Sequence, residues 1–518
     1  MVLLFQWGAR ALESAEGESP VWDETMHLDY GYGFSLHGPT FDAADHPYPI
    51  VALFTLPLTL GSSVTDRTGF LIPEDTSNLI PARAINLCLG ALGILLIALA
   101  VGRLTRANYG FLTFCLGTLD PSWMGQARYV TTDLAFGLFF VMTGLGVALY
   151  MKERRLKWLL GAGAMTGLAL SSKFSGLLLP PLVGGVIFLQ QTVLLKQGFG
   201  KGVREAARVS GILLLCGFLV LFSVFELHWL FGTTSFLDGP THWLKGLDRF
   251  TEIRDAGRGA FLLGAYSPSG FVGFFPILLV TKTPIVLLLL SVIGATHRRA
   301  TELEQPQGIL LLMGALFLLA SILSFVNLGY RHLTPLFPIG WVLGAFGLMK
   351  LKDYLGSKRA WAWAVPFALF LEVLGGHPHY LPWTNAFGGG TEEAHHIAVD
   401  SSTDWGQDLP GVRRFLHQEG SNELPHMAYF GTANPLHYGI KSVWRPCGTL
   451  GRPPVPGQPR AGCRSPSELF LISASCLAGV TGNPSTKLPD KDPCYEWLQD
   501  RNPDHVIGGS ILVFRNVP

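Results

Sequence analysis

Long apolar runs constrain what this chain can fold into more than any other feature of its sequence. Residues 84–102 (AINLCLGALGILLIALAVG) carry no charge and are long enough to cross a bilayer core of about 30 Å. Four further apolar runs lie at 131–151, 209–225, 271–295 and 308–326. Charged residues make up only 14% of the chain, against roughly 25% in soluble domains. The sequence therefore predicts a helical membrane protein with several spans.

These runs and several weaker ones predict about ten spans. They lie near residues 84–102, 108–127, 133–150, 157–172, 174–192, 208–231, 271–294, 308–327, 333–350 and 360–376. Lysine and arginine gather in every second connection, and such loops normally stay in the cytoplasm. Residues 21–83, the loop 232–270 and the chain after 376 therefore share the external face. The expected fold is an α-helical polytopic membrane domain, 1–376, followed by an external soluble domain, 377–518.

The chain begins with MVLLFQWGAR, an apolar run that is too short to span and lacks a signal-peptide cleavage site. We expect this run to be the end of a span whose first part is missing, as a late start codon would produce. The net charge of +1 gives no indication of a nucleic-acid partner.

The composition changes near residue 377, where Pro, Gly, Asn and Asp become frequent. Strands are favoured at 396–400, 426–430, 469–475 and 505–514, and a helix at 411–418. The sequence therefore predicts a soluble α/β domain. Four of the seven cysteines lie in it, namely Cys447, Cys463, Cys476 and Cys494. An even number on an oxidising face permits two disulfides in three possible pairings.

Residues 21–34 (VWDETMHLDYGYGF) gather charge in a chain that has little of it. A helix over 22–30 would place Asp23 and His27 on one face, four residues apart, with Glu24 pointing aside. A solvated loop with a capped helix start explains the same residues, because carboxylates favour first turns. The cluster lies on the predicted external face and precedes a second polar cluster, FDAADHPYP (41–49). These two facts favour a functional site.

Other charged residues lie where predicted spans reach the external face. They are Arg128, Asp133, Lys173, Glu226, His228, Arg331 and His332. Lys282 differs because it interrupts an apolar run, where an ionisable group is costly and is by default a functional candidate. Any one of these residues could instead make a helix-end contact or extend its charge to the interface. Together they predict a charged bowl, in which a carboxylate accepts a proton from a hydroxyl and cations stabilise a departing phosphate.

The order of these motifs resembles the family 39-type glycosyltransferases, membrane enzymes of the GT-C fold. This group is similar to protein O-mannosyltransferases and to the transferases that attach aminoarabinose to lipid A. The resemblance starts with Asp23-Glu24, His27 and FDAADHPYP. It continues through ALSSKFSGLLLPP (169–181), AYSPSGFVGFFPILLVTKTPIVLLLL (265–290), NLGYRHLTPLFP (327–338), HYLPWTNAFGGG (379–390), VDSSTDWGQDL (399–409) and YFGTANPLHYGI (429–440). The last three resemble the external tail of bacterial lipid-carrier-dependent members.

The resemblance implies an inverting transfer of a sugar from a polyprenyl-phosphate donor to a lipid, glycan or protein hydroxyl. The reaction would take place at the external face of a bacterial inner membrane. Asp23 is the implied catalytic base, and Glu24 would hold the base or the acceptor. The residues expected to bind substrates are His27, His46, Asp133, Arg128, Lys173, Lys282 and Arg331, with Lys282 and Arg331 foremost for the carrier phosphate.

The chain departs from many relatives at 46–49, where His-Pro-Tyr-Pro replaces a His or Lys followed by two adjacent prolines. The contact of His46 with the donor phosphate is therefore open. No cofactor is expected. The histidines and carboxylates are compatible with a divalent metal, but no ligand spacing requires one.

Two other classes of protein remain alternatives. A transporter or flippase of lipid-linked sugars would carry charges near the middle of its spans, whereas most charges here lie at one face. A non-catalytic membrane sensor or scaffold would leave the cluster around Asp23 unexplained. The identity of the sugar and acceptor and the role of the tail stay open. In the tail, WGQD (405–408) is either a binding motif or a capped turn built by Asp404 and Asp408.

Overall fold

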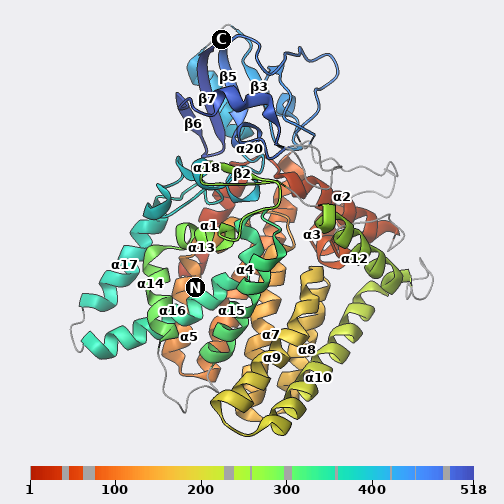
Figure 1. Cartoon of the computed structure of the whole chain (residues 1–518), viewed down its shortest axis with the longest axis vertical. Coiled ribbons are helices and arrows are strands. Elements are labelled where there is room, and N and C mark those ends of the chain that lie inside the picture. The colour runs from red at the N-terminus through yellow and green to blue at the C-terminus, as the bar shows by residue number, and fades with distance from the viewer. Residues whose placement is uncertain are drawn as a thin grey trace.

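The structure is a computed structural model. It describes residues 2–37, 46–61, 76–226, 238–256, 259–296, 306–355, 360–420, 423–449, 451–481 and 491–518. His228 and residues 41–45 of the second polar cluster lie outside this part of the chain. Figure 1 shows a bundle of long helices at one end of the long axis and a small sheet domain, drawn in blue, at the other.

Helices build the bundle and the layer between it and the sheet domain. The first group consists of α1 (Val2–Glu16), α2 (Trp22–His37), α3 (Tyr48–Gly61), α4 (Thr76–Leu104), α5 (Ala107–Thr118), α6 (Pro121–Ala127), α7 (Asp133–Glu153) and α8 (Leu156–Leu170). The second group consists of α9 (Leu179–Leu189), α10 (Phe199–Phe225), α12 (Asp238–Ala256), α13 (Phe274–Lys282), α14 (Ile285–Ala295), α15 (Pro306–Ser324), α16 (Leu336–Leu355) and α17 (Ala360–Leu374). Short helical turns η1 (Phe174–Leu178), η2 (Gln190–Leu194) and η3 (Tyr330–Leu333) connect some of them.

Several of these helices are long and apolar enough to cross a membrane. Within the described residues they are Leu79–Leu104, Asp133–Glu153, Phe174–Val193, Phe199–Phe225 and Gln307–Ser324, with the bent pair α13–α14 as a sixth. Shorter apolar helices lie at Leu156–Leu170 and Ala364–Leu374. The described residues of the ten predicted spans are mostly helical, and the several apolar helices confirm a polytopic helical membrane protein with a C-terminal domain. The number of ten spans stays a prediction.

Two predicted spans are not continuous helices. The predicted span 108–127 is split between α5 and α6, because Asp120 accepts hydrogen bonds from the amides of Ser122 and Trp123 and Pro121 begins a new helix. The predicted span 271–294 bends by 111° between α13 and α14. Thr283 precedes a proline and has extended backbone angles there, as expected for a residue in that position.

The bundle packs around α7, which is buried along most of its length. Helices α14 and α16 approach so closely that a Cβ added at Gly294 would lie 1.9 Å from the carbonyl oxygen of Leu343. Small residues permit this kind of contact between membrane helices. In contrast to the buried α7, helix α10 carries exposed apolar side chains. Leu215 and Leu219 are more than half exposed, as expected for side chains that face lipid.

A five-stranded sheet forms the core of the tail. Its order is β4 (Val443–Trp444), β3 (His426–Ala428), β5 (Ser467–Ser473), β7 (Ile511–Val517) and β6 (His505–Ile507). Strands β3 and β5 are parallel, whereas β7 runs antiparallel to both β5 and β6. Helices α19 (Leu409–Glu419) and α20 (Ala474–Ala478) complete the domain. A separate hairpin, β1 (Ala260–Leu262) and β2 (Ala265–Ser267), precedes α13.

The predicted helix 411–418 and the predicted strands 426–430 and 469–475 are confirmed. The predicted strand 505–514 is instead a hairpin, in which β6 and β7 run antiparallel on either side of a turn at residues 508–510. The first predicted strand is not a strand. Residues 396–400 form the end of helix α18 (Ala394–Ile397) and the start of the turn η5 (Asp400–Ser402). The strand prediction was wrong because Asp400 adopts a positive φ of 54° and its carboxylate accepts a hydrogen bond from the Ser401 amide. This turn directs the following residues toward the helical bundle.

Two disulfides join loops around the sheet. They link Cys447 to Cys476 and Cys463 to Cys494, which is one of the three pairings that the cysteine count permits. Cys88, Cys115 and Cys216 are free thiols in the helical part.

Candidate active site

Asp23 lies in the first turn of α2 and is only 7% exposed. Its carboxylate oxygen Oδ2 accepts a hydrogen bond from the guanidinium of Arg331 in η3. A buried carboxylate requires such a partner, because desolvation of an isolated charge is expensive. The sequence-predicted base and one of the predicted phosphate ligands therefore meet directly.

Arg331 joins Asp23 to a second acidic residue. Its Nη1 atom lies 3.5 Å from Oδ2 of Asp133, at the start of α7. The other oxygen of Asp133 accepts a hydrogen bond from Lys173, which precedes η1. Four predicted site residues thus form one chain of alternating charges, Asp23–Arg331–Asp133–Lys173. The chain is neutral as a whole when all four are ionised.

Two histidines lie near this chain. Nδ1 of His27 is 2.8 Å from the carbonyl oxygen of Val130 and donates to it, and the His27 ring centroid is 5.2 Å from that of His46. Burial, aided by His46, lowers the pKa of His27 below 6.5. His27 is therefore neutral at pH 7, and its Nε2 has no hydrogen-bond partner among the described residues.

The charges around Asp23 decide its protonation state. Burial acts to raise the pKa of its carboxyl, but Arg331, His27 and His46 outweigh that effect and hold the pKa below 3.8. Asp23 is consequently a carboxylate at neutral pH. This is the form that can accept a proton.

Glu24 faces away from this chain and pairs with an arginine that the sequence analysis did not single out. Arg83 donates from Nε and Nη2 to the two carboxylate oxygens of Glu24, at 2.9 and 2.6 Å. Glu24 also accepts from the amides of Val21 and Val130, at 2.9 and 2.8 Å. The Val21 contact caps α2 from its third position. Glu24 and Arg83 are fully buried, so this pair fixes the loops on either side of the site.

Arg128 has a comparable buried environment. Its Nη1 atom lies 2.8 Å from Oε1 of Glu18, and Nη2 donates to the hydroxyl of Tyr129 at 3.1 Å. Tyr129 in turn donates to Oε2 of Glu18 at 2.7 Å. Arg128 thus ties the segment between α1 and α2 to the end of α6. Its predicted contact with substrate stays a prediction.

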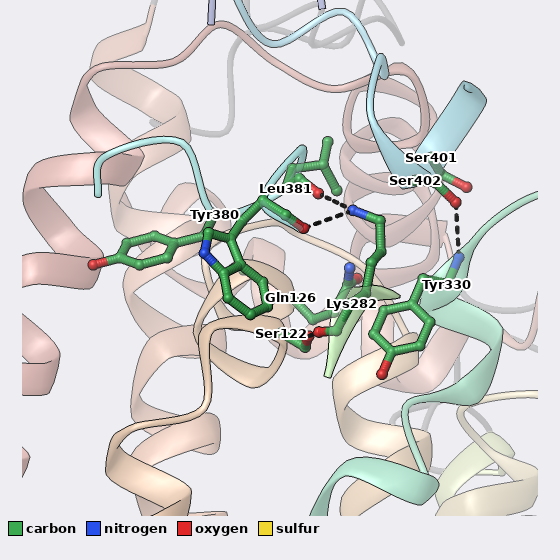
Figure 2. Close-up of a pocket in the computed structure, with 10 residues that line it drawn as sticks. Ser122, Gln126, Lys282, Tyr330, Tyr380, Leu381, Ser401 and Ser402 are labelled. Atoms are coloured by element: carbon green, nitrogen blue, oxygen red, sulfur yellow. Dashed lines mark hydrogen bonds between the residues drawn. The ribbon is translucent and has the colours of Figure 1, made fainter. Parts of the chain in front are cut away.

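Lys282 ends α13 and is buried, with 3% exposure. Its ammonium group donates to the carbonyl oxygens of Leu381 and Trp383, at 2.8 and 3.1 Å. Figure 2 shows this amine pointing toward the backbone of Leu381, with Ser401 and Ser402 on the opposite side of the lysine. The cavity there measures about 10 Å³, which is room for about one water molecule. It is also lined by Ser401, which contacts Arg331.

A larger cavity of about 480 Å³ lies on the other side of Trp383, which lines both spaces. Its wall includes Glu372 of α17, Thr384 and Asn385. The carboxylate of Glu372 accepts from the amides of Ile285 and Val286 where α14 begins, at 2.7 and 3.4 Å. The cavity therefore lies beside the bend between α13 and α14, and its volume is in the range of pockets that bind small ligands.

The described residues contain no group of three or more His, Cys, Asp and Glu side chains arranged to hold a metal ion. The sequence signals for Arg83 and Glu18 were weak. Arg83 is a single charge at the edge of an apolar run, whereas Glu18 is one of several acidic residues between positions 13 and 24. Their partners lie 59 residues (Arg83–Glu24) and 111 residues (Glu18–Tyr129) away in the chain.

Comparisons with known proteins bear on this arrangement. Residues 70–224 match the family described as dolichyl-phosphate-mannose-protein mannosyltransferase. The fold is similar to that of ArnT from Cupriavidus metallidurans bound to undecaprenyl phosphate, with a TM-score of 0.50, 14% identity, and coverage of 99% of this chain and 97% of that chain. For ArnT from the same organism in the apo state the TM-score is 0.50, the identity 13%, and the coverage 99% and 96%. No curated protein sequence shows a significant match.

The predicted resemblance to GT-C glycosyltransferases is confirmed by the family match and, for the fold, by the two ArnT structures. The matched segment 70–224 contains Asp133 and Lys173 but ends before Lys282 and Arg331. Asp23 precedes it. The roles of the individual site residues therefore stay predictions.

Proposed function

We propose that this chain, a polytopic membrane protein with the fold of the GT-C glycosyltransferases, transfers a sugar from a polyprenyl-phosphate donor to an acceptor hydroxyl. One observation carries the proposal. The ionised carboxylate of Asp23 lies buried against Arg331, in a chain of charges that also contains Asp133 and Lys173. A base and cations for a departing phosphate are thus next to each other.

The reaction is a direct displacement at the anomeric carbon. The acceptor oxygen forms a bond to that carbon, and its proton passes to Asp23. Arg331 holds Oδ2 of Asp23, so Oδ1 is the oxygen that takes the proton. The bond between the anomeric carbon and the phosphate oxygen breaks with its electron pair, and polyprenyl phosphate leaves. Attack from the face opposite the phosphate inverts the anomeric configuration.

The cations act on the leaving group. Negative charge grows on the phosphate as the bond breaks, and fixed cations in a site with little water stabilise it strongly. Arg331 and Lys173 are held in place by Asp23 and Asp133 before any substrate arrives. Lys282 adds a further positive charge that stabilises the leaving phosphate, and it lines the same small cavity as Ser401. This scheme requires no metal.

A lipid-linked donor suits the surroundings of the site. The ArnT structure with a similar fold holds undecaprenyl phosphate, and a donor of that class would remain in the bilayer while its sugar enters the site. The cavity of about 480 Å³ beside α17 offers space for a sugar or head group that arrives from the side. Because lysine and arginine gather in the opposite loops, the site would face the outside of a bacterial inner membrane. Two disulfides in the tail agree with an oxidising compartment.

The test uses purified protein in liposomes with radiolabelled undecaprenyl-phosphate hexoses and pentoses. Release or transfer of the label measures cleavage of the sugar–phosphate bond. We expect turnover by the wild-type protein and its loss in Asp23→Asn. The control is Asp29→Asn. Asp29 lies on the same helix, is half-buried, and has no ion pair with Arg331. Movement of label across the bilayer without bond cleavage would instead identify a flippase.

A further inference from the structure

We propose that the tail segment 399–409 is part of the transferase site, and that Ser401 and Trp405 are positioning residues that hold Arg331 against Asp23. This inference rests on the proposed function. It assigns a role in catalysis to the tail, whose role the sequence leaves open.

The segment first contacts the turn that carries Arg331. Ser401 Oγ accepts a hydrogen bond from Nε of Arg331 at 3.0 Å and donates to the carbonyl oxygen of Leu328 at 3.1 Å. Ser402 Oγ accepts from the amide of Tyr330 at 3.1 Å, a bond drawn in Figure 2. A Cβ added at Gly329 would lie 2.2 Å from Ser401 Oγ. The tail therefore packs closely against the turn that carries Arg331.

The same segment then packs on Arg331 itself. The guanidinium carbon lies 4.3 Å from the ring centroid of Trp405, within the range of a cation–π interaction. Trp405 is buried, with 1% exposure. The guanidinium contacts four side chains, Asp23, Asp133, Ser401 and Trp405. Two of the four come from the tail.

The segment finally runs beside the backbone that leads into Asp23. The amide of Trp22 donates to the carbonyl oxygen of Trp405 at 2.9 Å, and the amide of Ser19 donates to that of Gln407 at 2.8 Å. Ser19 Oγ also donates to the carbonyl oxygen of Gly406 at 2.8 Å. One piece of the tail therefore holds the residue immediately before the base and the cation that pairs with the base.

The segment is rigid because the sheet domain anchors it. The carboxyl group of Asp404 accepts from the amide of Ser475 at 2.8 Å, and that of Asp408 accepts from Ser510 Oγ at 2.7 Å. Gly406 has a φ of +89°, and a Cβ there would lie 2.8 Å from Gly431 and Phe430. Any other residue would be strained and crowded at this position. The position of Arg331 is thus coupled to the folded tail.

Ser401→Ala tests this coupling with a readout that loss of folded protein cannot imitate. The groups that act on Asp23 are Arg331, His27 and His46, and the carboxylates that act on Arg331 are Asp23, Asp133 and Asp400. A loosened Arg331 lowers the pKa of Asp23 less, so the acid limb of the pH–rate profile should move to higher pH. A purely structural defect would reduce turnover by the same factor at every pH.

The matched control is Ser473→Ala. Ser473 is a fully buried tail serine whose hydroxyl accepts from the amide of Phe430 at 3.0 Å, inside the sheet domain. This variant should keep the wild-type pH profile, and Ser401→Thr should restore most of it. Trp405→Leu should shift the acid limb in the same direction as Ser401→Ala. Superimposable profiles for wild type and Ser401→Ala would overturn the proposal while leaving the proposed function intact.

A second measurement distinguishes failure of the positioning role from failure of the proposed function, because it does not depend on activity. Ser401 and Asp23 share Arg331 as a partner, and substitutions that share a partner are not additive. The shift in Tm of the Ser401→Ala/Asp23→Asn double variant should therefore differ from the sum of the two single shifts. Additive shifts would overturn the positioning role. Absence of turnover in wild-type protein with non-additive shifts would instead refute the proposed function alone.

Discussion

Asp23 and Arg331 are 308 residues apart in the chain, and the guanidinium of Arg331 donates a hydrogen bond to Oδ2 of Asp23. The pair keeps Asp23 ionised in a buried place, where the carboxyl alone would take up a proton. It also keeps Arg331 in place for a phosphate. A phosphate that bound Arg331 would weaken its hold on Asp23, and the pKa of Asp23 would rise. Donor binding would thereby make Asp23 a stronger base.

Asp23→Asn should abolish most turnover and leave the fold intact. An amide cannot accept the proton, and general-base catalysis contributes about 10²–10⁴-fold to rates. Arg331 would keep its contacts with Asp133, Ser401 and Trp405, so Tm should stay near that of wild type. Sugar release by reconstituted protein measures the first effect, and thermal unfolding in detergent the second. Turnover within a factor of two of wild type would remove Asp23 from the role of base.

Glu24→Gln should behave in the opposite way, with a large loss of stability. Its carboxylate pairs with Arg83 and accepts from two backbone amides, in a place with no exposure to solvent. Loss of one partner of a buried ion pair costs about 3–5 kcal/mol. We expect a clear fall in Tm and in the yield of folded protein. Glu13→Gln is the control, because the side chain of Glu13 is 71% exposed and its loss should change Tm little.

The two disulfides should differ in their resistance to reduction. Cys447 and Cys476 are each 1% exposed, whereas Cys463 and Cys494 are partly exposed. Because thiol–disulfide exchange requires access to sulfur, mild reductant should open Cys463–Cys494 first. The three free thiols are blocked beforehand, and alkylation followed by mass spectrometry then identifies each newly released cysteine. Equal rates of labelling at both pairs would contradict this expectation.

Local sequence patterns predicted much of the fold and several of the residues that the structure brings together around Asp23. The spans were predictable because a run such as 84–102 contains its own signal, and Asp23 and His27 were found because they lie close together in the chain. The contacts of Ser401 and Trp405 with Arg331 were not predictable from one sequence. Arg331 is about 70 residues away in the chain. Nothing in the local pattern of 399–409 distinguishes a turn that packs only within the tail from a segment that contacts the site.

The predicted strand at 396–400 illustrates the same limit. His396 to Asp400 have an apolar pattern typical of a strand, but the turn at Asp400 depends on distant contacts. The amide of Asp400 donates to Ser475 Oγ at 3.1 Å, and the residue that follows contacts Leu328 and Arg331. Tertiary contacts with both the sheet and the helical bundle therefore override the local preference for a strand.

Asp404→Asn should change how stability depends on pH. Burial raises the pKa of Asp404 from 3.8 to about 7, so the folded protein retains a proton that the unfolded chain releases. The contribution of Asp404 to stability is therefore fully present below pH 3.8 and is lost as the pH rises to about 7. The slope in that window is about 1.4 kcal/mol per pH unit for one group. Asparagine can still accept from the Ser475 amide and does not titrate.

Thermal unfolding of the full chain in detergent, at intervals from pH 4 to pH 7.5, tests this effect. We expect the Tm of Asp404→Asn relative to wild type to rise with pH across the window and to level off near its upper end. Titrating groups that do not interact with Asp404 contribute equally to both proteins and cancel in the difference, whereas Asp400 and Asp408 interact with Asp404 and add to it. Asp504→Asn serves as the control, because Asp504 is exposed and should give a difference that does not vary in this way. A pH-independent difference for Asp404→Asn would mean that its carboxyl is ionised in the folded tail. The segment 399–409 would then contain a buried charge close to Arg331, and the electrostatic account of the site would have to include it.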